Sequence, residues 1–146
     1  MMRNATRRVA GICFLATVSV YSSTPELSDS ILGRYKAVTE SEWNFELELR
    51  KEGVAVYTLS SYEADESAKL ISKTEVQARW NLKGEVLSVT LSGSKPDQVI
   101  TYDVSACLSY KWFGGSSCSP GLQPTGTGVR QPYVQPLWNA KTFKFP

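Results

Sequence analysis

The chain has 146 residues, a length typical of one domain, and it contains no histidine. Three of its 16 basic residues and none of its 14 acidic residues lie in the first 22 positions, so the rest of the chain has a net charge of −1. This balance argues against a nucleic acid as a partner. Without histidine, a Ser-His-Asp triad, a Cys-His pair and an ordinary zinc site are excluded.

Residues 1–22 have the pattern of a secretory signal peptide. Arg3, Arg7 and Arg8 precede a short apolar run that ends near Val20, and small residues follow it. We expect cleavage after Ser22 and export to the periplasm or the medium. The run is shorter than the about 20 apolar residues of a spanning helix, so we expect membrane contact only before cleavage; an uncleaved anchor is the alternative.

The next segment predicts a short helical turn that ends at Gly33 and leads into a first strand. From residue 42 to residue 110, apolar and polar residues alternate, and tight turns separate the runs. This pattern predicts an all-β fold: an antiparallel up-and-down meander that closes into a small barrel or half-barrel. The residues expected to face inward are Trp43, Phe45, Leu47, Leu49, Ala55, Tyr57, Leu59, Val76, Ala78, Trp80, Leu82, Leu87, Val89, Leu91, Ile100, Tyr102, Val104, Ala106 and Leu108.

We place the barrel domain at residues 23–118. Residues 119–136 are rich in proline and glycine, and we expect an extended crossing segment there, not a central strand. Residues 137–146 alternate again, with Phe143 and Phe145 on one side. They predict a last strand that pairs with a free sheet edge, such as that of the first strand; a frayed tail is the alternative.

Cys107 and Cys118 are the two cysteines that remain after residue 22. In an oxidising compartment such a pair predicts a disulfide, which would stabilise the fold by about 3 kcal/mol. A redox site needs a closer Cys-x-x-Cys pair, and a metal site needs further ligands. We therefore expect a structural staple on the outer face of the sheet, with no metal and no cofactor.

The disulfide would enclose a loop with four candidate partner-binding residues, Tyr110, Lys111, Trp112 and Phe113. Aromatic side chains in a rigid loop lose little entropy on contact with a partner. The alternative is that Trp112 and Phe113 cap the open end of the barrel.

The interior is a second candidate site. Its predicted aromatic side chains either fill the core or line a cavity for a small apolar ligand. These residues are Trp43, Phe45, Tyr57, Trp80 and Tyr102.

Several of these features together resemble the small lipocalin-like barrel domains of bacterial envelope proteins, over residues 31–110. A Gly-x-aromatic sequence opens the first strand, a glycine turn joins two alternating strands, and a later strand with a tryptophan turns through a glycine. The corresponding residues are Gly33, Tyr35, Gly53, Trp80 and Gly84. The resemblance implies a lipocalin-like barrel; such domains sense envelope stress, carry ligands or inhibit enzymes.

No motif predicts an enzyme. Ser92 and Lys95 match Ser-x-x-Lys, but they lie in a predicted turn before Pro96 and not at the start of a helix. The same turn, with Ser94, is similar to the Ser-Gly-Ser loop of exported lysozyme inhibitors. We therefore expect an exported, non-catalytic binding module whose partner is an envelope protein or a cell-wall hydrolase. An inhibitor or immunity protein against such a hydrolase and a carrier of a small apolar ligand are the alternatives.

Overall fold

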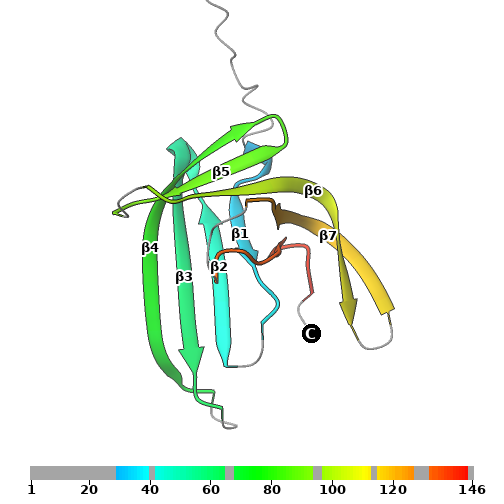
Figure 1. The fold of residues 1–146 in the computed structure, drawn as a ribbon. Helices are drawn as coiled ribbons and strands as arrows, with labels where there is room; N and C mark the ends of the chain where they lie inside the picture. The colour runs from blue at the N-terminus through cyan, green and yellow to red at the C-terminus, as the bar shows by residue number, and fades with distance from the viewer. Residues whose placement is uncertain are drawn as a thin grey trace, which may run out of the picture.

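The computed structural model describes residues 29–39, 42–64, 68–93, 97–112, 115–126 and 132–144, and for residues 112, 115 and 116 it describes the backbone alone. Within these ranges, eight antiparallel strands form one sheet that closes into a barrel in chain order (Figure 1). The predicted all-β meander is therefore confirmed. The strands are β1 (Gly33–Lys36), β2 (Trp43–Leu49), β3 (Val54–Tyr62), β4 (Leu70–Lys83), β5 (Val86–Leu91), β6 (Val99–Trp112), β7 (Gly115–Pro124) and β8 (Leu137–Asn139).

The barrel closes between the first and the last strand. Tyr35 of β1 pairs with Asn139 of β8, and Lys36 pairs with Trp138, while the other edge of β1 pairs with β2. The predicted pairing of the last strand with the first is thus confirmed. The strand ends at Asn139 and is therefore shorter than the predicted strand over residues 137–146.

The period-two pattern explains strands β2 to β6. Most of the predicted inward side chains are buried and pack in one cluster, the barrel core, and most of their neighbours are exposed or half-buried, although Val56 and Ser60 of β3 are buried. The tight turns are made at Gly53 and Gly84, whose φ angles of +71° and +60° favour glycine. The fully buried residues of the barrel core with the largest side chains include Phe45, Leu47, Leu49, Tyr57, Leu87 and Tyr102.

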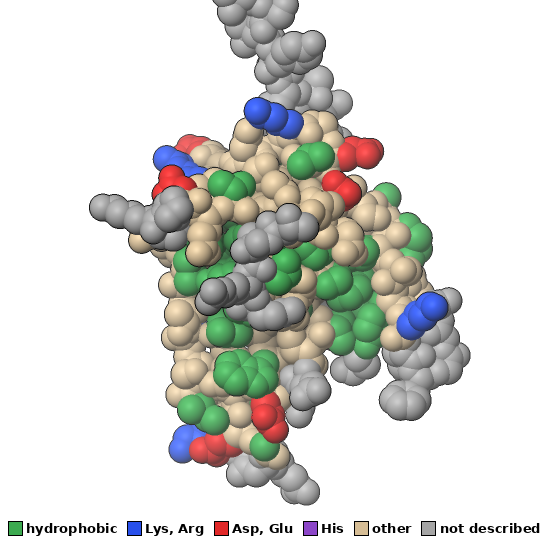
Figure 2. All heavy atoms as spheres, in the orientation of Figure 1, with side chains coloured by type: hydrophobic (Ala, Val, Ile, Leu, Met, Phe, Trp, Pro, Cys, Tyr) green, Lys and Arg blue, Asp and Glu red, His purple; other side chains and the backbone are tan. Residues whose placement is uncertain are grey.

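One predicted inward residue at the end of the sheet is not buried. Trp43 is 50% exposed, although Phe45, two residues further along β2, is buried. The cause is position: Trp43 is the first residue of β2 and pairs with Ser61, near the end of β3. Figure 2 shows hydrophobic side chains on the surface at this end of the molecule.

The second error in the inward set is Ala106, which is exposed. The register between β6 and β7 shifts between Ser105 and Leu108, which leaves one extra residue in β6. Such a bulge bends a strand and interrupts the alternation of its side chains. Beyond the bulge, β6 and β7 leave the barrel as a hairpin (Figure 1).

The prediction that residues 119–136 contain no central strand is wrong for their first part. β7 extends to Pro124 and pairs with β6 on one side and with β8 on the other. Pro120 has no partner in the register, because it lies opposite the bulge of β6, where its missing N–H is not needed. The barrel thus continues past residue 118 to Asn139.

The chain before β1 is described from Asp29. Asp29 and Ser30 are helical, the N–H of Leu32 donates to the Asp29 carbonyl over 3.3 Å, and Gly33 follows with a φ of +132°. The expected helical turn before the first strand is therefore present at this end. The predicted signal peptide, residues 1–22, lies outside the described residues. Within the described ranges, no helix has the length and hydrophobicity needed to cross a membrane.

Candidate functional site

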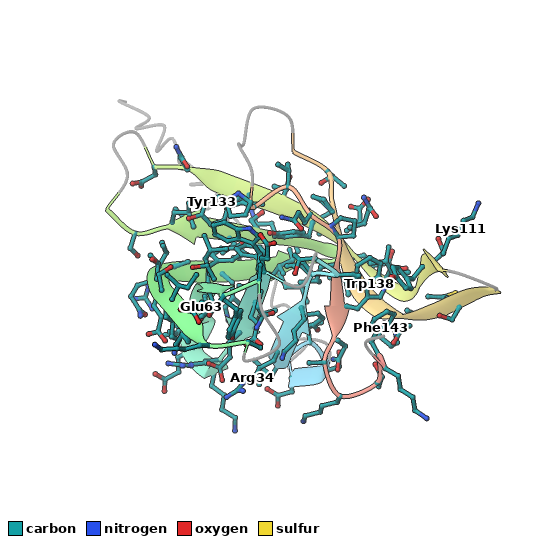
Figure 3. The ribbon with its side chains drawn as sticks, turned by 90° about the horizontal axis from the view of Figure 1, so that it is seen from below. Arg34, Glu63, Lys111, Tyr133, Trp138 and Phe143 are labelled. Carbon is teal, nitrogen blue, oxygen red and sulfur yellow. A yellow bond between two sulfur atoms is a disulfide. The ribbon has the colours of Figure 1, made fainter. Side chains whose placement is uncertain are left out.

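The middle of the barrel is occupied by three tyrosines. The hydroxyl oxygens of Tyr57 and Tyr102 lie 2.9 Å apart, and the Tyr102 hydroxyl donates to the backbone carbonyl of Tyr133 over 3.1 Å. The Tyr133 ring meets the rings of Phe45 and Tyr57 edge to face, at centroid distances of 5.8 and 5.1 Å. Figure 3 shows Tyr133 over the end of the barrel that faces the viewer.

These contacts describe a filled interior at the level of the tyrosines. Tyr57 and Tyr102 are fully buried, and Phe45 stacks on Tyr57 at 5.4 Å. Burial raises the pKa of Tyr57 well above its usual range, and the hydroxyls of Tyr102 and Tyr133 raise it further. Burial also raises the pKa of Tyr102, against a smaller opposing effect of the Tyr57 hydrogen bond. Both groups are therefore neutral hydrogen-bonding groups at physiological pH.

Tyr133 also bears on the two interpretations of the interior that the sequence left open. It comes from residues 132–136, which are part of the predicted crossing segment 119–136. Its position between Pro132 and Pro136 was the available signal, since an isolated aromatic in a proline-rich run has few local partners. The carrier interpretation stays a prediction, and the tyrosine contacts favour the filled core.

The second candidate feature is the part of the β6–β7 hairpin beyond the bulge, residues 107–118, which we call the distal hairpin. Cys107 and Cys118 form a disulfide across it, as predicted, and both residues are exposed. The strands of the distal hairpin pair from Ser109 with Cys118 to Trp112 with Gly115. The disulfide thus joins the base of a two-stranded extension of the barrel.

A second hydrophobic cluster supports the distal hairpin. Leu108, Trp138 and Phe143 are buried in it, and Tyr110 packs against them. The Tyr110 ring lies 5.4 Å from both the Trp138 and the Phe143 rings, which stack on each other at 5.3 Å. The indole N–H of Trp138 donates to the Leu108 carbonyl over 3.2 Å.

This cluster is separate from the barrel core. Leu137 belongs to the barrel core and Trp138 to the second cluster, because successive side chains of a strand point to opposite faces. β8 therefore divides the two cores. Figure 3 shows Trp138 and Phe143 together on the side of the molecule from which the hairpin extends.

The predicted binding residues have different positions in the distal hairpin. Tyr110 is half-buried in the second cluster, so its ring holds the hairpin in place. Lys111 is exposed and points away from the barrel (Figure 3). The side chain of Trp112 and the whole of Phe113 lie outside the described residues.

The predicted Ser-Gly-Ser loop joins β5 to β6. Ser92 is exposed there, and its N–H donates to the Gln77 carbonyl over 2.9 Å. Gly93 follows with a φ of +87°, and the chain turns at residues 92 and 93. Ser94 and Lys95 lie outside the described residues. The inhibitor interpretation therefore stays a prediction.

The outer face of β1 to β4 forms a shallow groove of about 290 Å³. Its charges are paired, with Lys36 2.7 Å from Glu46 and Arg34 3.8 Å from Glu48. Burial pushes the pKa of Glu46 up, but the hydrogen bonds from Lys36 and Asn44 and the charges of Lys36 and Arg34 together lower it below its usual value. The groove thus offers paired charges to a ligand, not an excess of either sign.

Comparisons with known proteins add no further constraint. No protein-family model matches this sequence, and no curated protein or solved structure is similar to it at a significant level. In the part of the chain that the structure describes, no group of three or more cysteine, aspartate or glutamate side chains is placed to hold a metal ion.

Proposed function

We propose that this chain is an exported, non-catalytic binding module that contacts a protein partner through its distal hairpin. The observation that supports this most is the second cluster, which holds the hairpin without contributing to the barrel core. Together with the Cys107–Cys118 disulfide it holds the described strands of the exposed hairpin, residues 107–112 and 115–118, beside the barrel. A surface that is already ordered loses less conformational entropy when it binds.

The chemistry of the hairpin suits a protein surface better than a small ligand. Lys111 supplies an exposed charge, and the sequence places Trp112 and Phe113 directly after it. Tryptophan, tyrosine and arginine are the residue types that most often dominate the binding energy of protein interfaces, and Trp112 belongs to this group. The pattern of residues 1–22 and the resemblance to lipocalin-like envelope domains support a periplasmic or secreted location, and hence an envelope protein or a cell-wall hydrolase as the partner.

Site-specific photocrosslinking tests the proposal. A photoreactive amino acid replaces Lys111 in the full chain, and a second version carries it at Val86, an exposed position on β5 outside the hairpin. We expect periplasmic extract to give a discrete crosslinked species from position 111 and none from position 86. The same species from both positions, or none from position 111, would contradict the proposal.

Competition with unlabelled chain identifies the residues that matter. Wild-type chain and a Val86→Ala, Val99→Ala control should suppress crosslinking at position 111 equally, since both control positions lie outside the hairpin. A Trp112→Ala, Phe113→Ala chain should suppress it at least about tenfold less well, the loss typical of one important interface residue. Equal competition by all three chains would show that Trp112 and Phe113 do not contribute to the interface.

A further inference from the structure

Part of β4 has a free edge in the barrel. β4 pairs with β3 from Leu70 to Arg79 but with β5 only from Ala78 onward. At the junction, the Gln77 carbonyl accepts from the N–H of Ser92. Among the described strands, none pairs with the β5 side of residues 71–76, which we call the free edge. In Figure 1 no strand lies beyond the lower half of β4.

The direction of the backbone groups on this edge follows from Gln77. In a β-strand the N–H and C=O groups of one residue point to the same side, and those of the next residue point to the opposite side. Because the Gln77 carbonyl points toward β5, the groups of Lys73 and Glu75 point the same way, to the free edge. Thr74 between them points toward β3, where it pairs with Leu59.

We propose that the free edge pairs with the same edge of a second copy of this chain, as two antiparallel β4 strands related by a two-fold axis at Thr74. With this axis residues 72–76 of the two copies pair, and the pairing stops short of Gln77, whose carbonyl already accepts from Ser92. An axis at Lys73 would pair residues 71–75, an equal length of the edge, so the charges of the facing side chains decide between the two registers.

Charge complementarity supports this register. With the axis at Thr74, Lys73 lies directly opposite Glu75 of the second copy, and the pair occurs twice. Opposite charges at directly facing positions stabilise a strand pair, and like charges destabilise it. An axis at Lys73 or at Glu75 would instead place two like charges face to face. In the single chain the two side chains form an ion pair at 2.7 Å and are both about half exposed, so they are accessible to a partner.

The backbone geometry fits the same register. Lys73 and the facing Glu75 would exchange both N–H···O=C bonds, and Thr74 would face Thr74 in a pair without hydrogen bonds, as antiparallel pairing requires. Ile71, at the end of the free edge, is 63% exposed and would approach Gln77 of the second copy, where the pairing ends at Ser92. An edge of this length predicts a small interface and a weak dimer.

Charge exchange between copies gives a sharp test. Lys73→Glu alone and Glu75→Lys alone each place like charges face to face in a homodimer, so each should dimerise more weakly than the wild-type chain. A mixture of the two variants restores both opposite-charge pairs, and it should form a heterodimer. Because each variant has lost its own ion pair, only pairing between chains explains recovery on mixing.

Sedimentation equilibrium of the full chain, over about 1 µM to 1 mM, provides the measurement. We expect wild-type chain to dimerise, each single variant to do so at least about tenfold more weakly, and the mixture to recover the wild-type constant. Monomeric wild-type chain over the whole range overturns the proposal, and an extended peptide would then be the candidate for this edge. Dimers unaffected by both variants overturn it as well. Matched far-UV spectra and urea midpoints establish that the variants fold.

Discussion

The hydroxyl groups of Tyr57 and Tyr102 meet at 2.9 Å in the barrel, although 45 residues separate them in the chain. The bond connects β3 to β6 across the interior. The Tyr102 hydroxyl in turn donates a hydrogen bond to the Tyr133 carbonyl of the crossing segment. A polar chain therefore runs through an apolar core, with each hydroxyl satisfied. This relationship makes the two tyrosines unequal in their contributions to stability.

Tyr102→Phe should destabilise the protein more than Tyr57→Phe. Removal of the Tyr57 hydroxyl leaves Tyr102 with the Tyr133 carbonyl as a partner, and we expect a cost of about 1 kcal/mol. Removal of the Tyr102 hydroxyl removes both bonds and leaves the buried Tyr57 hydroxyl without its partner, at about 2–3 kcal/mol. Urea unfolding measures both values, and equal costs or the reverse order would contradict the hydrogen-bond chain.

The same two groups predict a loss of stability at alkaline pH. Their pKa values are raised in the folded chain, and unfolded tyrosine ionises near pH 10. Their contribution is therefore complete below pH 10 and is lost as the pH rises above it, by up to about 1.4 kcal/mol per tyrosine for each pH unit. The free energy of unfolding should fall less steeply between pH 10 and 11 in a Tyr57→Phe, Tyr102→Phe chain. Parallel curves for the two chains would refute this prediction.

Gly121 allows β7 and β8 to approach each other. A Cβ atom at this position would lie 2.6 Å from the Leu137 carbonyl oxygen and 2.7 Å from the Leu108 side chain. Gly121→Ala should therefore cost about 2–3 kcal/mol, because a backbone atom must move. Gly126→Ala is the matched control: its Cβ would lie 3.1 Å from the Thr101 side-chain hydroxyl and 3.8 Å from the Thr101 backbone nitrogen, an ordinary contact distance, and the change should cost less than about 1 kcal/mol. Thermal unfolding that ranks the two variants equally would contradict the close approach.

The disulfide should stabilise the distal hairpin more than the barrel. Cys107→Ser, Cys118→Ser should lower the free energy of unfolding by about 3 kcal/mol, the chain-entropy value for a loop this short. The amides of Leu108 and Tyr110 should also exchange with solvent faster relative to the amide of Tyr102, because the bulge separates them from the barrel. Hydrogen exchange measures this ratio. Equal acceleration at all three amides would show that hairpin and barrel open as one unit.

The sequence predicted β2 to β6 well, because one face of each strand is buried and turns separate the strands. The aromatic Tyr57 and Tyr102 were placed inside for that reason. Trp43 shows the limit of the rule, since alternation gives the face of a residue but not the position at which a strand leaves the barrel.

β7 was not predicted as a strand, because Pro120 and Gly121 argue against a central strand. Both residues fit only once their neighbours are known: Pro120 lies opposite the bulge, and Gly121 makes room for β8. The second cluster could not be predicted for a different reason. It joins Tyr110 to Trp138 and Phe143 across two strands and a turn, a pairing that depends on the bend of the hairpin.

A single solution NMR measurement of nuclear Overhauser effects tests the central claim, that the barrel closes and a second cluster holds the hairpin beside it. The account predicts contacts between the backbones of Tyr35 and Asn139, which close the barrel, together with contacts between the Tyr110 and Trp138 rings. Absence of the first contacts would leave an open sheet. Absence of the second would leave the distal hairpin without the support on which its proposed binding role depends.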